Sequence, residues 1–265
     1  MSLKAEDIYN FLNNWSPLNI QDPQDNSGLQ IGDLSIKVKG ILLCIDVTQK
    51  AIDFAKNHNL NLIISHHPLI FHPLKRISSE DFIGNLILQL VKSDITLLSW
   101  HTPLDKVEDG VSEAILNKIG FKGNDFIVKT EQINNRIFGI GRVVYLEKSI
   151  KLQELANKIK EAFNSWVMVV GEEDTQIESF AVCGGSGSFL INELQKLKIN
   201  TFITSDVKYH LAKECEALGF NLILIDHAVG ESAVLEVLEK KLSEFLKNKN
   251  IAIKTYFEKS PYKIL

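Results

Sequence analysis

The stretch ILLCIDVT at residues 41–48 has a counterpart 139 positions further along the chain, FAVCGGSG at residues 180–187. The same offset carries the apolar run Leu62–Ser65 onto Thr201–Thr204. In both places a run of strand length is followed by a polar turn. The repetition indicates one strand–helix–strand unit present twice, with chance similarity as the alternative because identities between the copies are few.

Apolar runs of strand length alternate with amphipathic, helix-like segments along the rest of the chain. The expected strands cover residues 41–47, 60–64, 95–100, 180–183, 201–204 and 221–225. Strands separated by helices are typical of an α/β protein with largely parallel sheets. Ligands of such sheets bind at the carboxyl ends of the strands, so the residues that follow each strand are the candidates for function.

Composition excludes several classes of protein. A chain of 265 residues with 45% hydrophobic residues can bury a full core without disulfides, and its three cysteines have no paired spacing, which favours a reduced, cytoplasmic protein. The net charge of −4 argues against nucleic-acid binding. No apolar stretch is long enough for a transmembrane helix or a signal peptide, so no membrane partner is expected.

Histidine is concentrated at the ends of the expected strands. Six of the seven histidines lie there, namely His66, His67, His72, His101, His210 and His227. In SHHP the adjacent His66 and His67 can face one site only where the strand breaks, and Pro68 marks that break. The alternative is that His66 alone binds or catalyses, while His67 forms a hydrogen bond to the backbone.

Two segments share the pattern of a histidine, three residues and a carboxylate. They are His101 with Asp105 and His227 with Glu231. This spacing brings both side chains to one face of a helix, and imidazole and carboxylate are ligands that Zn, Fe, Mn and Ni accept. With His66 and His67 these residues predict a site for a pair of metal ions. The alternative is a network of aspartate–histidine hydrogen bonds that stabilises the strand ends.

Two further segments follow strands in the second half. The glycines of CGGSGS, Gly184, Gly185 and Gly187, would let backbone amides approach an anion, although a simple tight turn is the favoured alternative. In SDVKYH, His210 is a candidate general acid and Lys208 a candidate contact for substrate phosphate. The alternative for SDVKYH is helix capping by Ser205 or Asp206.

Taken together, the motifs DNSGLQIG, DVT, SHHPLIF, HTPLD, GGSG, DVKYH and H-x3-E occur in this order over nearly the whole chain. This set resembles the Nif-three-like proteins, which are also known as GTP cyclohydrolase I type 2, in their short form without an inserted domain. The chain departs from the family at Ser205, where a glycine is common, and at Asp226 and Ala228, where a glycine and an aromatic residue commonly flank the last histidine. We expect Asp226 to strengthen cation binding or to orient His227.

The resemblance implies a fold of two intertwined repeats of an αβ(βα)n unit, assembled into a toroidal homohexamer with two divalent transition-metal ions (Zn, Fe, Mn or Ni) per chain. The implied boundaries are residues 1–128 with 219–265 for the first unit and 129–218 for the second. The metal ligands implied are His66, His67, Asp105, His227 and Glu231, with His101 lining the site.

The expected function is that of a dinuclear metal-dependent hydrolase acting on the ring of a purine nucleotide such as GTP. In this hypothesis His101 or His210 transfers protons, and Gly184, Gly185, Gly187 and Lys208 contact the substrate. A metal-dependent phosphoesterase would use the same residues. The third alternative is a metal-binding or regulatory scaffold without catalysis.

Overall fold

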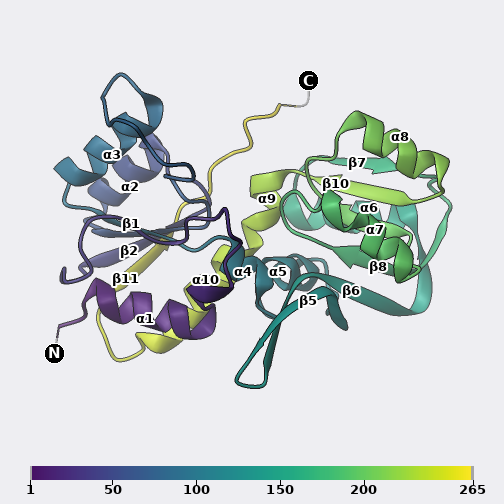
Figure 1. Ribbon diagram of the computed structural model, residues 1–265, viewed down its shortest axis with the longest axis horizontal. Coiled ribbons are helices and arrows are strands. Elements are labelled where there is room, and N and C mark those ends of the chain that lie inside the picture. Colours follow the sequence, from purple (N-terminus) through teal and green to yellow (C-terminus); the bar gives the residue numbers. More distant parts are fainter. Residues whose placement is uncertain (1, 264–265) are drawn as a thin grey trace. The chain divides into compact units, whose positions relative to one another are not determined.

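The computed structural model describes residues 2–263, which form two units with one β-sheet each (Figure 1). The first unit comprises the residues up to Leu104 together with Leu235–Glu258. The second unit comprises Asp105–Val234 and the segment that begins at Lys259. The chain therefore passes between the units three times, within helix α4 (Thr102–Lys106), within helix α10 (Ala233–Phe245) and between Glu258 and Lys259.

These boundaries differ from those expected at 128/129 and 218/219. Strand β10 (Asn221–Ile225) pairs with strands β9 (Thr201–Thr204) and β7 (Val167–Val170), so it belongs to the second sheet. Helix α5 (Val111–Lys118) contacts helix α9 (His227–Glu231), which also lies in the second unit. Pairing between distant strands, which periodicity does not report, determines where the units divide.

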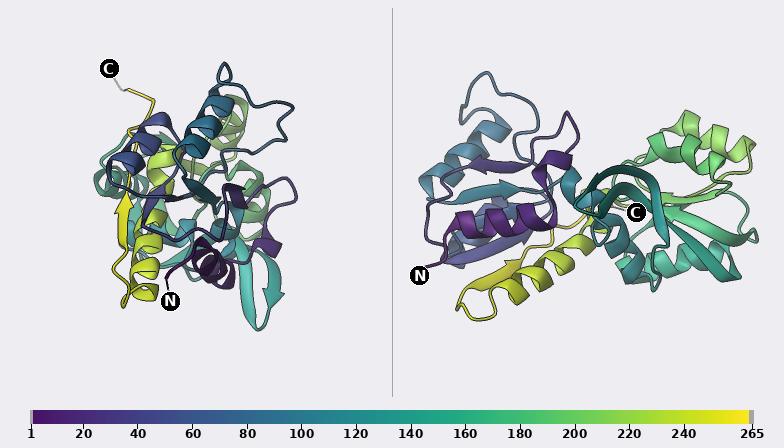
Figure 2. Two further views of the ribbon diagram at one scale, coloured as in Figure 1. Left: turned by 90° about the vertical axis from the view of Figure 1, so that its left-hand side faces the viewer. Right: turned by 60° about the horizontal axis from the view of Figure 1, so that its bottom comes forward.

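The first sheet has the order β1-β4-β3-β2-β11. Its strands are β1 (Gly28–Ile31), β2 (Gly40–Cys44), β3 (Leu62–Ser65), β4 (Thr96–Ser99) and β11 (Ala252–Thr255). All neighbours are parallel except β1 and β4. Helices α2 (Gln49–Asn57) and α3 (Phe82–Lys92) cover one face, and α1 (Ala5–Trp15) and α10 the other (Figures 1 and 2). A short 3-10 helix, η1, spans Leu18–Ile20.

The second sheet has the order β5-β6-β8-β9-β10-β7. Its further strands are β5 (Asp125–Ile133), β6 (Arg136–Lys151) and β8 (Gln176–Val182). Only β8, β9 and β10 pair in parallel. The remaining helices of the second unit are α6 (Leu152–Phe163), η2 (Ser188–Leu190), α7 (Ile191–Lys196) and α8 (Tyr209–Ala217).

Several inner strands of the two sheets are fully buried, in keeping with their apolar sequences. Every residue of β2, β3 and β4, and likewise of β9 and β10, is buried, as expected for parallel strands covered on both faces. Each unit has its own hydrophobic cluster, with Leu42, Ile63 and Leu97 in the first and Phe202 and Leu222 in the second. Within residues 2–263, no helix has the length and apolar character needed to span a membrane.

The duplication expected from the sequence is visible in the topology. An offset of 139 residues maps the bounds of β1 onto those of β7 and the bounds of β3 onto those of β9. The strand order β1-β4-β3-β2 of the first sheet matches β7-β10-β9-β8 of the second, and each repeat begins with a helix, α1 or α6. In both repeats the first strand runs antiparallel to its neighbour. The predicted α/β fold of two repeats with mixed sheets is confirmed; pairing is largely parallel in the first sheet, whereas three of the five strand pairs of the second sheet are antiparallel.

Candidate functional site

In the first unit, candidate side chains gather at one edge of the sheet. The parallel strands β2, β3 and β4 all end at this edge, and Asp46, His66 with His67, and His101 follow them. Strand β1 runs antiparallel to β4, so Asp25, which precedes β1, enters at the same edge. The topology therefore brings together residues far apart in sequence.

His66, His67 and His101 form one cluster. Their ring centroids lie 5.1, 5.2 and 5.5 Å apart, and one nitrogen from each lies within 4.8 Å of the others. His66 is fully buried, while the other two are partly accessible. Three imidazole nitrogens at this separation could hold a metal ion.

Each ring of this cluster is oriented by a hydrogen bond from Nδ1. His66 donates to the carbonyl oxygen of Trp100 at 3.0 Å, His67 to Asp46 Oδ1 at 2.8 Å, and His101 to Asp25 Oδ1 at 3.0 Å. A carbonyl or carboxylate oxygen only accepts, so Nδ1 carries the hydrogen and Nε2 keeps its lone pair. Metal-binding histidines are held in this way in proteins.

Asp25, which accepts from His101, also accepts hydrogen bonds from Thr102 and Ser27. Burial raises the pKa of its carboxyl group, but hydrogen bonds from His101, Thr102 and Ser27 outweigh burial and hold that pKa well below its ordinary value. Both Thr102 Oγ1 and the Thr102 backbone N–H donate to Asp25 Oδ2, at 2.6 and 3.1 Å. The DNSG segment is therefore a support for His101, a role that sequence reasoning did not assign.

In the second unit, strands β8, β9 and β10 end at one edge in the same manner. The GGSG turn follows β8, Asp206 follows β9 and His227 follows β10. His227 and Glu231 lie on the single turn of α9, where their i, i+4 spacing places His227 Nε2 3.3 Å from Glu231 Oε2. Glu231 is buried, with 3% of its surface exposed, so this carboxylate lies where a cation would balance its charge.

Asp206 orients His227, because the Nδ1 of His227 donates a hydrogen bond to its carboxylate. Asp206 adopts a left-handed backbone conformation, with φ of 47°. The neighbouring Asp226 had been expected to orient His227, but it caps α9 by accepting from the backbone N–H of Val229 at 3.1 Å. An offset of 139 residues makes Asp206 the counterpart of His67, a relation that the sequence repeat contains and that could have revealed this role.

Asp105 belongs to the same neighbourhood of the second unit as Glu231. Burial raises the pKa of the Cys183 thiol, and the negative charges of Asp105 and Glu231 raise it further. Cys183 therefore stays protonated, and the carboxylates, rather than a thiolate, are the candidate ligands beside His227.

The GGSG turn lies against these residues. Gly185 has φ of +64°, and a Cβ atom there would lie 2.6 Å from Glu231 Oε1 and 3.4 Å from His227 Nε2. The N–H of Gly184 donates to Ser112 Oγ at 3.3 Å, and that of Gly187 to Thr204 Oγ1 at 2.9 Å. Because two of the three glycine amides are used inside the protein, the tight-turn interpretation describes the segment best, and its glycines permit close approach to Glu231.

Lys208 and His210 occupy the surface after β9. Both are exposed; Lys208 directly precedes α8, and His210 lies in its first turn, 5.5 Å from the ring of Tyr209. The contact of Lys208 with substrate phosphate and the proton transfer by His210 stay predictions.

Comparisons with known proteins show the family to which the chain belongs. The family described as Duf34/NIF3 (NGG1p interacting factor 3) matches residues 3–261. A protein of Clostridium acetobutylicum named GTP cyclohydrolase 1 type 2 homolog is 35% identical over 243 residues, covering 91% of this chain and 90% of that protein. A homolog of the same name from Clostridium perfringens is 31% identical over 99% of this chain and 100% of its own length.

A solved structure shows a fold similar to that of this chain. A crystal structure of a hypothetical protein from Staphylococcus aureus has a TM-score of 0.93 and 26% sequence identity, and the match covers 100% of both chains. The match in fold over the whole length, together with the match to the family, confirms the resemblance drawn from the motifs. The chain belongs to the Duf34/NIF3 family.

Proposed function

We propose that the protein is a metal-dependent hydrolase. One observation carries the proposal: His66, His67, His101 and His227 each donate from Nδ1 to a fixed acceptor. Hydrogen bonds of this kind set the tautomer in which Nε2 can bind a metal ion. A purely structural network would not require the same nitrogen to be held in four rings.

We further propose two divalent ions per chain, of Zn, Fe, Mn or Ni. The proposed ligands are His66 and His67 from the first unit and Asp105, His227 and Glu231 from the second. Imidazole and carboxylate together suit these metals. Support comes from the geometry within each unit and from the resemblance drawn from the motifs.

The chain's own residues have separate roles in this proposal. A bound divalent ion would supply an acidified water, because binding to zinc lowers the pKa of water to about 7. Asp25 keeps His101 in one tautomer with Nε2 able to accept a proton, so His101 is the proposed proton carrier, with His210 as the second candidate. Burial of Glu231 excludes water from the carboxylate.

The proposed substrate is a purine nucleotide such as GTP, since relatives carry the name GTP cyclohydrolase 1 type 2 homolog. Product analysis after incubation with GTP and a divalent metal tests this assignment. Release of formate supports ring opening. Release of phosphate without formate favours a phosphoesterase, and neither product with any of the four metals contradicts hydrolysis and leaves a metal-binding scaffold.

We also propose that six chains form a closed ring in the cytoplasm. The three cysteines are free and buried, as expected in a reducing compartment. Ring assembly follows from the family resemblance and requires an interface that closes. Light scattering on a sizing column is expected to report six chains, and a stable monomer at micromolar concentration would contradict the ring.

A further inference from the structure

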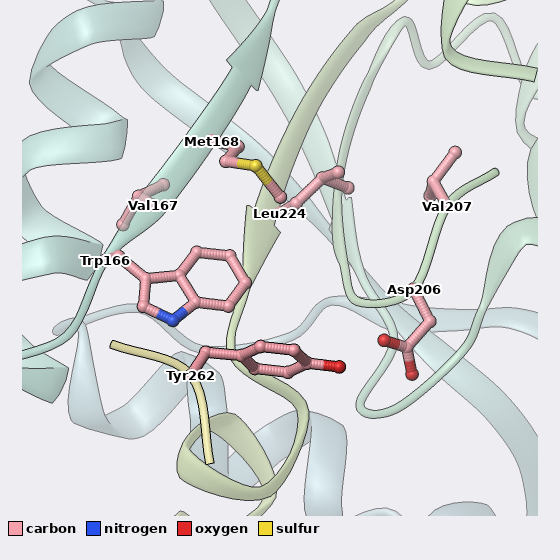
Figure 3. Close-up of a pocket in the computed structure, with 7 residues that line it drawn as sticks. All are labelled: Trp166, Val167, Met168, Asp206, Val207, Leu224 and Tyr262. Atoms are coloured by element: carbon pink, nitrogen blue, oxygen red, sulfur yellow. The ribbon is translucent and has the colours of Figure 1, made fainter. Parts of the chain in front are cut away.

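We propose that a pocket in the second unit binds a planar nitrogen heterocycle that presents N–H donors. This inference rests on the proposed function and names the part of the substrate that the protein recognises. The pocket has a volume of about 440 Å³, within the usual range for small-molecule sites. It is lined by Trp166, Val167, Met168, Asp206, Val207, Leu224 and Tyr262 (Figure 3).

Two aromatic rings form one side of the pocket. The centroids of Trp166 and Tyr262 lie 6.4 Å apart, with the planes at 83°. Val167, Met168 and Leu224 add apolar surface. Flat aromatic ligands stack on such side chains, and every heterocyclic base has a π-face for this contact.

Asp206 supplies the polar edge. Its carboxylate already accepts a hydrogen bond from His227 Nδ1, but a carboxylate has about four acceptor positions and can take further N–H groups. In Figure 3 the hydroxyl end of Tyr262 and the carboxylate of Asp206 lie on the same side of the pocket. An N–H edge of a stacked ring would therefore meet a negatively charged acceptor.

The pocket lies at the edge of the sheet that carries His227. Strand β7 runs antiparallel to β10, with Val167 opposite Ile225, so Trp166 lies at the end of the sheet where β10 stops. A ligand bonded to Asp206 would contact the same carboxylate that orients His227. Asp206 would therefore both bind the ring of the ligand and orient the candidate metal ligand His227.

The C-terminal segment holds Tyr262 in place. Ser260 Oγ donates to the carboxylate of Asp226, and the backbone N–H of Tyr262 donates to Ser260 Oγ at 3.1 Å. Trp166 Nε1 is buried and has no hydrogen-bond acceptor among residues 2–263. A carbonyl or ring nitrogen of a ligand would satisfy this donor.

Two residues that line the pocket differ in type from their counterparts in the first repeat. At the 139-residue offset, Trp166 and Asp206 correspond to Ser27 and His67 of the first repeat. There, Ser27 donates to Asp25 and His67 belongs to the histidine cluster. The same framework therefore carries imidazoles in one repeat and an aromatic pocket in the other.

Guanosine is the probe that tests the pocket, because its adjacent N1–H and N2–H donors match a carboxylate, whereas adenosine offers one amino donor beside an acceptor. Isothermal titration with the metal-loaded full chain is expected to show tighter binding of guanosine than of adenosine. Trp166→Ala and Tyr262→Ala should weaken guanosine binding about tenfold or more, the typical loss when a base loses an aromatic partner. Trp166→Phe keeps an aromatic face but loses the Nε1 donor, so it should weaken guanosine binding less than Trp166→Ala does.

Two controls separate the pocket from other effects. Tyr145→Ala removes an exposed tyrosine of β6 outside the pocket and should leave guanosine binding unchanged. Asp206→Asn should abolish the preference for guanosine over adenosine, a ratio that does not depend on overall stability. Equal affinity for the two nucleosides in the unmutated protein would overturn the role of Asp206.

The outcomes distinguish this inference from the proposed function. Absence of guanosine binding to protein that carries metal overturns the pocket and leaves the hydrolase proposal standing. Guanosine binding without any metal binding supports the pocket and contradicts the hydrolase. If Trp166→Ala leaves guanosine binding intact but changes the number of chains in solution, the pocket is a contact between copies and the inference fails.

Discussion

Gly185→Ala is expected to remove metal from the residues of the second unit while the protein stays folded. A Cβ atom at this position would lie 2.6 Å from Glu231 Oε1, closer than non-bonded atoms approach, and 3.4 Å from His227 Nε2. Because the added atom would overlap with Glu231 Oε1, the carboxylate must turn away from the position in which it could bind a metal ion. Elemental analysis of purified protein should show at least one ion fewer per chain.

Gly219→Ala is the matched control. Gly219 has φ of +66°, nearly the same as the +64° of Gly185, but apart from Gly219 and its chain neighbours no heavy atom of residues 2–263 lies within 4 Å of the place that a Cβ atom would take there. Both variants therefore carry the left-handed strain of about 1–2 kcal/mol. Thermal unfolding should show a similar loss of stability from this strain, with metal retained only in Gly219→Ala. Equal metal content in the two variants would show that Gly185 has no role beside Glu231.

Asp105→Ala is expected to reduce the release of formate from GTP by orders of magnitude. Asp105 lies with Glu231 around Cys183, and its loss removes one of the two carboxylates that would hold the ion. A bound ion would lower the pKa of water toward neutrality, so loss of the ion would remove the proposed source of the nucleophile. The measurement is the initial rate of formate release at saturating metal.

Asp174→Ala is the control for this experiment, since Asp174 is an exposed aspartate paired with Lys151 at the surface of the same unit. It should release formate at the rate of the unmutated protein. If Asp105→Ala retains full activity with its metal content reduced, the proposed hydrolysis does not depend on this ion.

Much of the fold could be predicted because the two repeats have similar apolar runs in the sequence. Leu62–Ser65 and Thr201–Thr204 are buried strands of the same length at the same place in two sheets, and their apolar runs are visible in the sequence. The boundaries between the two units were harder to predict from the sequence. They depend on which distant strands pair, and β10 joins the second sheet through hydrogen bonds to β7 and β9.

The candidate ligands were also visible, because histidines at strand ends are conspicuous. Their supporting residues were not, since Asp25 and Asp46 are ordinary turn residues until β1 and β2 place them beside His101 and His67. The expectation that Asp226 orients His227 was wrong for a related reason, while its expected effect on cation binding stays a prediction. A residue next to His227 in sequence faces the helix backbone, while Asp206, from another strand, faces the ring.

Metal content is the most direct test of the central claim, that rings held through Nδ1 present Nε2 to metal ions. Protein purified without chelator, or reconstituted with Zn, Mn and Fe, is expected to carry up to two ions per chain by elemental analysis. His66→Ala and Glu231→Ala should each lose at least one. A chain that binds none of these metals after reconstitution would contradict the account.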